Sequence, residues 1–154
     1  MIRAAIGLGS NQGDAAGHIC AAFDRLMELG TVVARSSLYS TPPWGVTDQP
    51  PFVNAAALLD TALSPHALLD ALKRFEREAG RVVTYRWGPR VLDLDILTYG
   101  DQRIDEAGLT IPHARLTERA FVLVPLAAID PHYVPLRDAL PPGERAAVVE
   151  LDRQ

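Results

Sequence analysis

The stretch RWGPRVLDLDILTY, residues 86–99, contains the most informative pattern in the chain. In an extended strand, side chains two residues apart project from the same face. Asp93 and Asp95 therefore share one face. The opposite face is an apolar row of Leu92, Leu94 and Ile96. The pattern predicts a strand that is buried on one side and presents paired carboxylates on the other.

Paired carboxylates next to a loop that carries arginines indicate a site for phosphates. Two oxygen ligands suit Mg²⁺, which takes one or two carboxylates and completes its shell with water and phosphate oxygens. Arg86 and Arg90 flank Trp87 just upstream, and the planar guanidinium group matches phosphate. Two interpretations stay open at this point. One is a phosphoryl-transfer site, and the other is a strand with solvent-facing aspartates beside a loop of solvated arginines.

Size and composition predict one globular domain over residues 1–154. The apolar fraction of 48% and the charged fraction of 22% are ordinary values for such a domain. The net charge of −4 argues against binding to nucleic acid or to an acidic membrane surface. Lys73 is the only lysine among 15 cationic side chains, so phosphate recognition would fall mainly to arginine.

The sequence also indicates a soluble, cytoplasmic protein, which we expect to be a monomer. The opening residues MIRAAIGLGS lack the apolar core of a signal peptide, and no apolar run approaches the roughly 20 residues that span a membrane. The single cysteine, Cys20, cannot form an internal disulfide. Its neighbours Ile19 and Phe23 predict a small buried side chain rather than a nucleophile.

The predicted elements follow the order strand, helix, strand, strand, helix, strand. Strands are predicted over residues 2–8, 31–40, 52–62 and in the 86–99 stretch, and helices over about 14–29 and 65–79. This order is that of the ferredoxin-like α+β fold, with both helices on one face of an antiparallel sheet. The first strand is apolar on both faces, which predicts a central position.

The second half of the chain has a less regular pattern. Residues 100–112 predict a hairpin or a short strand. Residues 117–129 predict a short helix capped by Thr117, although Pro125 interrupts its pattern. Between the predicted strands lies a loop, 41–51, in which four of eleven residues are proline, and a loop of this length in a small domain is more often functional than idle.

Four segments together resemble one known family. They are GSNQGD at 9–14, YSTPPWGVTDQPPFVNAA at 39–56, RWGPRVLDLDI at 86–96 and LTIPHARLTERAF at 109–121. In this order they are similar to the 6-hydroxymethyl-7,8-dihydropterin pyrophosphokinases of folate biosynthesis. The resemblance implies a ferredoxin-like α+β fold. It also implies transfer of the β,γ-pyrophosphoryl group of ATP to the hydroxymethyl group of the dihydropterin, with release of AMP.

The resemblance further implies roles for particular residues. Asp93 and Asp95 match aspartates that hold two Mg²⁺ ions in the family, and Arg90 matches a catalytic arginine. The pterin site would comprise Thr41, Pro43, Trp44, Phe52, Asn54 and Phe121. The ATP site would comprise Glu76, Arg81, Trp87, Arg90, Ile96, Thr110, His113 and Arg119.

The chemistry of these side chains fits the implied ligands. A flat pterin ring needs aromatic faces and in-plane hydrogen-bond partners, which Phe52, Phe121 and Asn54 offer. Without the resemblance, core packing would be favoured for both phenylalanines. Ile96 is predicted to form an apolar shelf for the adenine, and His113 to donate to a phosphate.

Two departures from the family leave a second class of function open. Many members carry arginine at the positions of Val83 and Gly108, so a non-catalytic protein that binds pterin or nucleotide is an alternative. A Rossmann-type dehydrogenase is a weaker alternative, prompted by Gly7, Gly9 and Gly13. The spacing is GxGxxxG, and no acidic residue ends a second strand at the distance that ribose binding needs.

Overall fold

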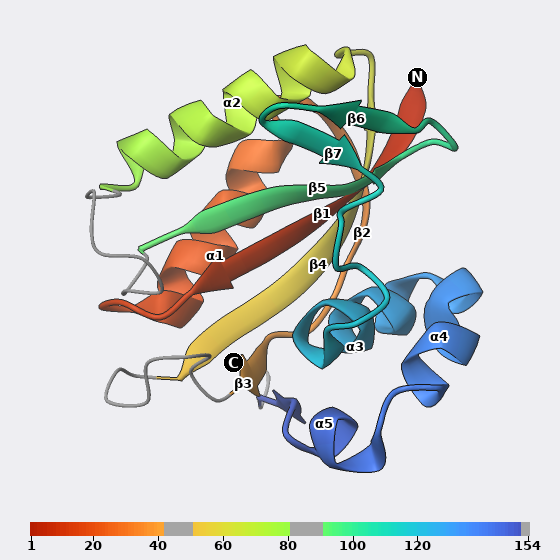
Figure 1. The fold of residues 1–154 in the computed structure, drawn as a ribbon. Coiled ribbons are helices and arrows are strands. Elements are labelled where there is room, and N and C mark those ends of the chain that lie inside the picture. The colour runs from red at the N-terminus through yellow and green to blue at the C-terminus, as the bar shows by residue number, and fades with distance from the viewer. Residues whose placement is uncertain (42–50, 81–90, 152–154) are drawn as a thin grey trace.

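The computed structural model describes residues 1–41, 51–80 and 91–151, drawn in Figure 1. In the described residues, the first two thirds of the chain contain strands and two longer helices, and shorter helices dominate the last third. The strands are β1 (Ile2–Ser10), β2 (Gly30–Arg35), β3 (Tyr39–Thr41), β4 (Phe52–Thr61), β5 (Asp93–Tyr99), β6 (Ile104–Glu106), β7 (Leu109–Ile111) and β8 (Val149–Glu150). The helices are α1 (Ala15–Leu26), α2 (Pro65–Glu78), α3 (Ala120–Ile129), α4 (Val134–Asp138) and α5 (Pro142–Ala146), with a 3₁₀ turn at Pro131–Tyr133.

The described residues form a six-stranded sheet in which every pair is antiparallel. β1 lies between β5 and β4, and the long β4 pairs with β2 and β3 along its other edge. The predicted ferredoxin-like α+β fold is confirmed, as is the central position of the first strand. An antiparallel sheet also rules out a Rossmann fold, whose strands are mostly parallel.

The strand predicted over residues 31–40 is wrong in one respect, because the structure has two strands there. Ser36 separates them. Its backbone N donates to the carbonyl oxygen of Ala56 over 2.8 Å, and its side-chain Oγ accepts from the Ala56 N over 2.9 Å. A serine hydroxyl thus replaces a backbone carbonyl in the ladder, and the chain bends between β2 and β3.

The helix boundaries follow the capping signals in the sequence. Asp14 accepts from the Gly17 N at the start of α1, and Ser64 accepts from the Ala67 N at the start of α2. Gly80, at φ +91°, follows the end of α2 as predicted. α1 ends at Leu26, earlier than the predicted residue 29.

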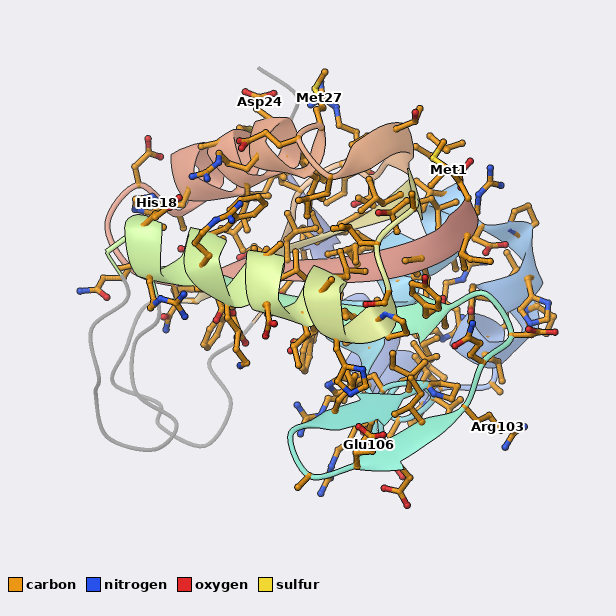
Figure 2. All side chains as sticks on the ribbon, turned by 90° about the horizontal axis from the view of Figure 1, so that it is seen from above. Met1, His18, Asp24, Met27, Arg103 and Glu106 are labelled. Carbon is orange, nitrogen blue, oxygen red and sulfur yellow. The ribbon has the colours of Figure 1, made fainter. Side chains whose placement is uncertain are left out.

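Two helical layers enclose the sheet. α1 and α2 cover one face, on which Ile6, Leu94 and Ile96 are buried, so the predicted apolar row of β5 is confirmed. Figure 2 shows these two helices side by side, and an ion pair of 2.6 Å between Arg25 and Glu78 joins them. α3 packs on the opposite face, mainly against β4. Sequence patterns had predicted helices on one face only.

α3 differs from its prediction. It begins at Ala120, Thr117 does not cap it, and Pro125 lies inside it. The helix is apolar nearly all round, and Leu123 and Leu126 are fully buried. Burial of these side chains outweighs the one hydrogen bond that proline removes.

The environment of Cys20 also corrects its prediction, since the thiol is exposed. Ile19 and Phe23 lie on the buried side of the same helix, α1. Adjacent residues on a helix point about 100° apart, so a cysteine next to a buried isoleucine faces solvent.

The last third of the chain returns to the sheet. β6 and β7 form the hairpin predicted within residues 100–112. After α5, β8 pairs with β3, and the Leu151 N donates to the Leu38 oxygen over 2.8 Å. Nothing in the sequence had indicated this added strand.

Candidate active site

The predicted carboxylate pair lies on the face of β5 opposite the apolar row that packs under α1 and α2. Asp93 and Asp95 are partly exposed, whereas Leu94 between them is buried. In the register of β1 and β5, Asp93 faces Gly9 and Asp95 faces Gly7. Directly opposed residues of antiparallel strands point to the same face, so each carboxylate lies beside a position without a side chain.

The same row continues across the sheet to Asn54. Gly9 pairs with Asn54 on β4, and Asn54 pairs with Tyr39 on β3. Asn54 is buried, and its Nδ2 donates to the Thr41 Oγ1 over 2.9 Å. A Cβ added to Gly9 would lie 3.0 Å from the Asn54 Oδ1. Glycine at position 9 therefore leaves room for the asparagine amide beside the carboxylate strand.

Phe52 lies two residues before Asn54 on the same face of β4. It pairs with Thr41 and is partly exposed. The structure thus brings three predicted pterin residues, Thr41, Phe52 and Asn54, to the end of β4 that adjoins the row of glycines.

His113 follows the β6–β7 hairpin and is attached to β5, because its N donates to the Leu97 oxygen over 2.9 Å. Its Nδ1 accepts from the Arg115 N over 3.3 Å, so a neutral ring carries its proton on Nε2. Burial lowers the pKa of His113 below 6.5, Arg119 lowers that pKa further, and Asp93 opposes both. The imidazole is therefore a neutral Nε2–H donor at neutral pH.

Arg119 stands directly before α3 and near the carboxylates. Burial and the charge of Arg115 lower its pKa, while Asp95 raises that pKa. A guanidinium group nevertheless stays charged at neutral pH. Its Cζ lies 5.5 Å from the centre of the Phe121 ring. The charge of Asp93 thus acts on the pKa of His113, and the charge of Asp95 acts on the pKa of Arg119.

Glu76 has a different environment from the other predicted ATP residues. It lies on α2, only 3% exposed, and its Oε2 accepts from the Leu94 N over 2.8 Å. Its predicted contact with ATP stays a prediction. Thr110 is exposed on β7, the strand that contacts β5.

The shelf predicted for adenine at Ile96 stays a prediction, and the structure shows only the surroundings of this side chain. The side chain of Ile96 is buried in the core with α1 and α2, on the face away from Asp95. The alternation of the strand explains this, since Ile96 is next to an aspartate that faces outward.

Several predictions fall outside the described residues. Pro43 and Trp44 lie within 42–50, and Arg81, Val83, Trp87 and Arg90 lie within 81–90. Gly108 is described and lies between β6 and β7 with φ +87°. A side chain there would have open space but a backbone conformation that L-residues rarely adopt.

Sequence reasoning missed some polar residues of this region. Asn11 and Ser10, at the end of β1, are almost completely buried, and so is Tyr39. Tyr39 pairs with Asn54 in the row and Asn11 directly follows β1, so both buried side chains are candidates for holding the site in place. Their burial depends on how β1, β3 and β4 come together in the fold, and the local sequence around each residue gives no sign of it.

The donor set of the described residues fits a partly hydrated divalent cation. In the ranges 1–41, 51–80 and 91–151, no group of three or more His, Cys, Asp and Glu side chains could hold a metal ion. Two carboxylates on an open face instead leave ligand positions for water and phosphate oxygens, as Mg²⁺ prefers.

Comparison with known proteins identifies the family. The family model described as 7,8-dihydro-6-hydroxymethylpterin-pyrophosphokinase (HPPK) matches residues 5–131. The chain belongs to this family. A 2-amino-4-hydroxy-6-hydroxymethyldihydropteridine pyrophosphokinase of Methylorubrum extorquens is 50% identical over 136 residues, which cover 87% of this chain and 86% of the relative. The protein of that name from Pseudomonas aeruginosa is 51% identical over 132 residues, covering 84% and 81%.

Longer relatives contain a similar segment. The mitochondrial folate synthesis bifunctional protein of Pisum sativum is 48% identical over 122 residues, which cover 79% of this chain but 24% of that protein. Among solved structures, a Plasmodium falciparum HPPK-DHPS A437G with STZ-DHP has a TM-score of 0.70 at 16% identity. The match covers 89% of this chain and 45% of that one, and it supports the HPPK fold.

Proposed function

We propose that the sheet face with Asp93, Asp95 and Asn54 is where this pyrophosphokinase-family member performs its reaction. The reaction transfers the β,γ-pyrophosphoryl group of ATP to the hydroxymethyl group of 6-hydroxymethyl-7,8-dihydropterin and releases AMP, a step of folate biosynthesis. The observation that carries the assignment is the row in which Asp93, Gly9 and Asn54 face the same way across three strands.

Asp93 and Asp95 would hold two Mg²⁺ ions together with phosphate oxygens and water. When bound, Mg²⁺ offsets charge on the phosphate chain and lowers the pKa of the attacking hydroxyl group. The two aspartates supply the negative charge and the orientation that such binding needs. Opposite them, Gly9 leaves room for the Asn54 amide and Gly7 leaves room for the Leu97 side chain.

The phosphate chain would lie between the carboxylates and two donors. His113 donates from Nε2, the nitrogen left protonated by its bond with Arg115. Arg119 adds a charged fork, and Arg90, Arg81 and Trp87 complete the predicted set. Positioning and electrostatic stabilisation dominate in phosphoryl transfer, so these contacts fit the chemistry without a covalent intermediate.

The pterin would lie on the β4 side of the row. Asn54 offers an in-plane amide whose orientation is fixed by its bond to Thr41. Phe52 and Phe121 are both partly exposed and would stack on the two faces of the ring. Pro43 and Trp44 belong to the same proposed pocket.

The nucleotide product tests the proposal. The chain is incubated with ATP, Mg²⁺ and the dihydropterin, and AMP and ADP are separated by chromatography. AMP that appears only with pterin supports pyrophosphoryl transfer, and ADP contradicts it. Gly108 lacks the arginine of many family members, which favours the non-catalytic alternative. That alternative is supported if both ligands bind while neither product forms.

We further propose a monomer in the cytoplasm. Cys20 is a lone exposed thiol, which suits a reducing compartment. In the part of the chain that the structure describes, no helix is long and apolar enough to cross a membrane. Light scattering after gel filtration would measure the mass in solution, and a dimer mass would contradict the proposal.

A further inference from the structure

The buried carboxyl group of Glu76 contacts the peptide between the two aspartates. Its Oε2 accepts from the Leu94 N over 2.8 Å, and Glu76 is 3% exposed. We propose that Glu76 is a positioning residue, which anchors this peptide and so fixes the direction in which Asp93 and Asp95 project. The inference rests on the proposed function, because it takes the two aspartates as metal ligands.

The position of β5 explains why its outer edge needs an anchor. In the described part of the sheet, β5 is the last strand of the order and pairs with β1 alone. Its register with β1 shifts next to Ile96, so regular pairing at the site runs only from Ile96 back to Asp93. The Leu94 N–H instead bonds to a side chain of α2, which lies against β5.

The residues opposite the aspartates cannot orient them. Cross-strand side chains usually restrict one another, but Asp93 and Asp95 face Gly9 and Gly7. As at any residue of a strand, the direction of each Cα–Cβ bond is set by the backbone, here that of β5. Glu76 holds that backbone from the side opposite to β1. A peptide fixed on both edges projects its neighbouring side chains in one direction.

A carboxylate is a strong acceptor for this purpose. A charge-assisted hydrogen bond from a backbone N–H is shorter and stronger than a neutral one. Removing a group that orients a metal ligand commonly weakens metal binding about tenfold to a hundredfold. At 3% exposure, Glu76 presents little surface to a nucleotide, so its effect should reach ATP through the metal.

Four variants separate positioning from other roles. Glu76→Ala removes the acceptor, and Glu76→Gln keeps an acceptor oxygen without the charge. Glu78→Gln is the matched control, since Glu78 lies on the same helix, accepts from the Arg25 Nη2 over 2.6 Å and is outside the site. Asp95→Asn is the reference for loss of a proposed ligand.

The affinity for Mn²⁺ is measured by electron paramagnetic resonance or by calorimetry in the presence of a nonreactive ATP analogue. Nucleotide binding in EDTA and thermal unfolding are measured on the same samples. We expect Glu76→Ala to bind Mn²⁺ at least about tenfold more weakly, with nucleotide binding in EDTA nearly unchanged. Glu76→Gln should lie between Glu76→Ala and wild type, and Glu78→Gln should equal wild type.

The outcomes distinguish this inference from the proposed function. Wild-type Mn²⁺ affinity in Glu76→Ala, with a loss in Asp95→Asn, overturns the positioning role and leaves the site standing. Wild-type affinity in Asp95→Asn overturns both. Weaker nucleotide binding in EDTA for Glu76→Ala overturns the role in favour of direct ATP contact. If Glu76→Ala does not fold, Glu76→Asp withdraws the carboxylate by one methylene, and wild-type Mn²⁺ affinity in this folded variant overturns the inference.

Discussion

The two faces of the central sheet use the same strands for different purposes. On the face under α1 and α2, β1 and β5 contribute large buried side chains such as Ile6 and Leu94. On the other face, at the ends where Asp93 and Asn54 lie, the strands carry glycine, carboxylates and an amide. α3 covers this second face mainly where small and apolar residues such as Ala56 and Leu97 recur.

This difference teaches how stability and chemistry are divided in the molecule. Alternation along one strand assigns each successive residue to one purpose or the other. Substitutions on the face under α1 and α2 should therefore change the free energy of unfolding. Substitutions on the carboxylate row should change catalysis and ligand binding, with little change in unfolding.

Asp95→Asn should have the largest effect on activity. The substitution keeps the shape of the side chain but removes the negative charge that the proposed Mg²⁺ site requires. We expect kcat to fall by about 10²–10³ or more, the loss typical of a deleted electrostatic contact at a reacting group. AMP formation under saturating substrates measures it. A melting temperature that falls with activity would break the division between the two faces.

Leu59→Ala tests the opposite face. Leu59 on β4 is fully buried against the helices. Removing a buried leucine side chain usually costs about 2–5 kcal/mol of stability. Urea unfolding measures this cost, and kcat per folded molecule should stay near that of wild type. A large drop in kcat at temperatures where the variant is folded would show that core packing also sets the site geometry.

Gly9→Ala sharpens the comparison within the row itself. The new Cβ would lie 3.0 Å from the Asn54 Oδ1, so the amide must move. We expect pterin binding to weaken by about 1–2 kcal/mol, roughly five- to thirtyfold. ATP binding should change much less. Titration of each ligand separately measures both affinities, and an equal loss for both would contradict a pterin role for Asn54.

Gly108→Arg should have a smaller and mixed effect. Position 108 has φ +87°, so an arginine there should cost about 1 kcal/mol of stability. The resemblance predicts that the restored guanidinium lowers the KM for ATP by a few-fold. Gly108→Ala is the control, because it carries the same backbone strain without the charge. A KM that changes equally in both variants would rule out a direct contact with ATP.

Local patterns in the sequence predicted the central elements well. The alternation of β5, the cap at Ser64 and the stop at Gly80 each depend on neighbouring residues, and the structure agrees with them. Predictions that depended on distant contacts were weaker. The break at Ser36 requires Ala56 as a partner, and the helix through Pro125 requires burial against the sheet.

The candidate site shows the same limit. Asp93, Asn54 and His113 were predicted from motifs. The structure puts Asp93 and Asn54 in one row across β5, β1 and β4, and a backbone hydrogen bond joins His113 to Leu97 of β5. The sequence could not show that Glu76 bonds to Leu94, because the two residues are 18 positions apart and meet only when α2 packs on β5. The burial of the Ile96 side chain, in contrast, was predicted from strand alternation, and the structure agrees with it.

A pH dependence of stability on the site face should be the smallest effect. The pKa of His113 is lowered in the folded state, chiefly by burial, whereas the unfolded chain has the ordinary value of 6.5. Below pH 6.5 the unfolded state therefore binds more protons than the folded state. The neutral ring makes its full contribution to stability above that pH, and this contribution is lost as the pH falls through the folded-state pKa.

His113→Gln cannot take up that proton. Urea unfolding of both proteins between about pH 5 and pH 8 should show wild type losing stability relative to the variant on acidification. A difference that stays constant across this range would mean that His113 is as accessible to protons in the folded protein as in the unfolded one, and that the site face is open at this position.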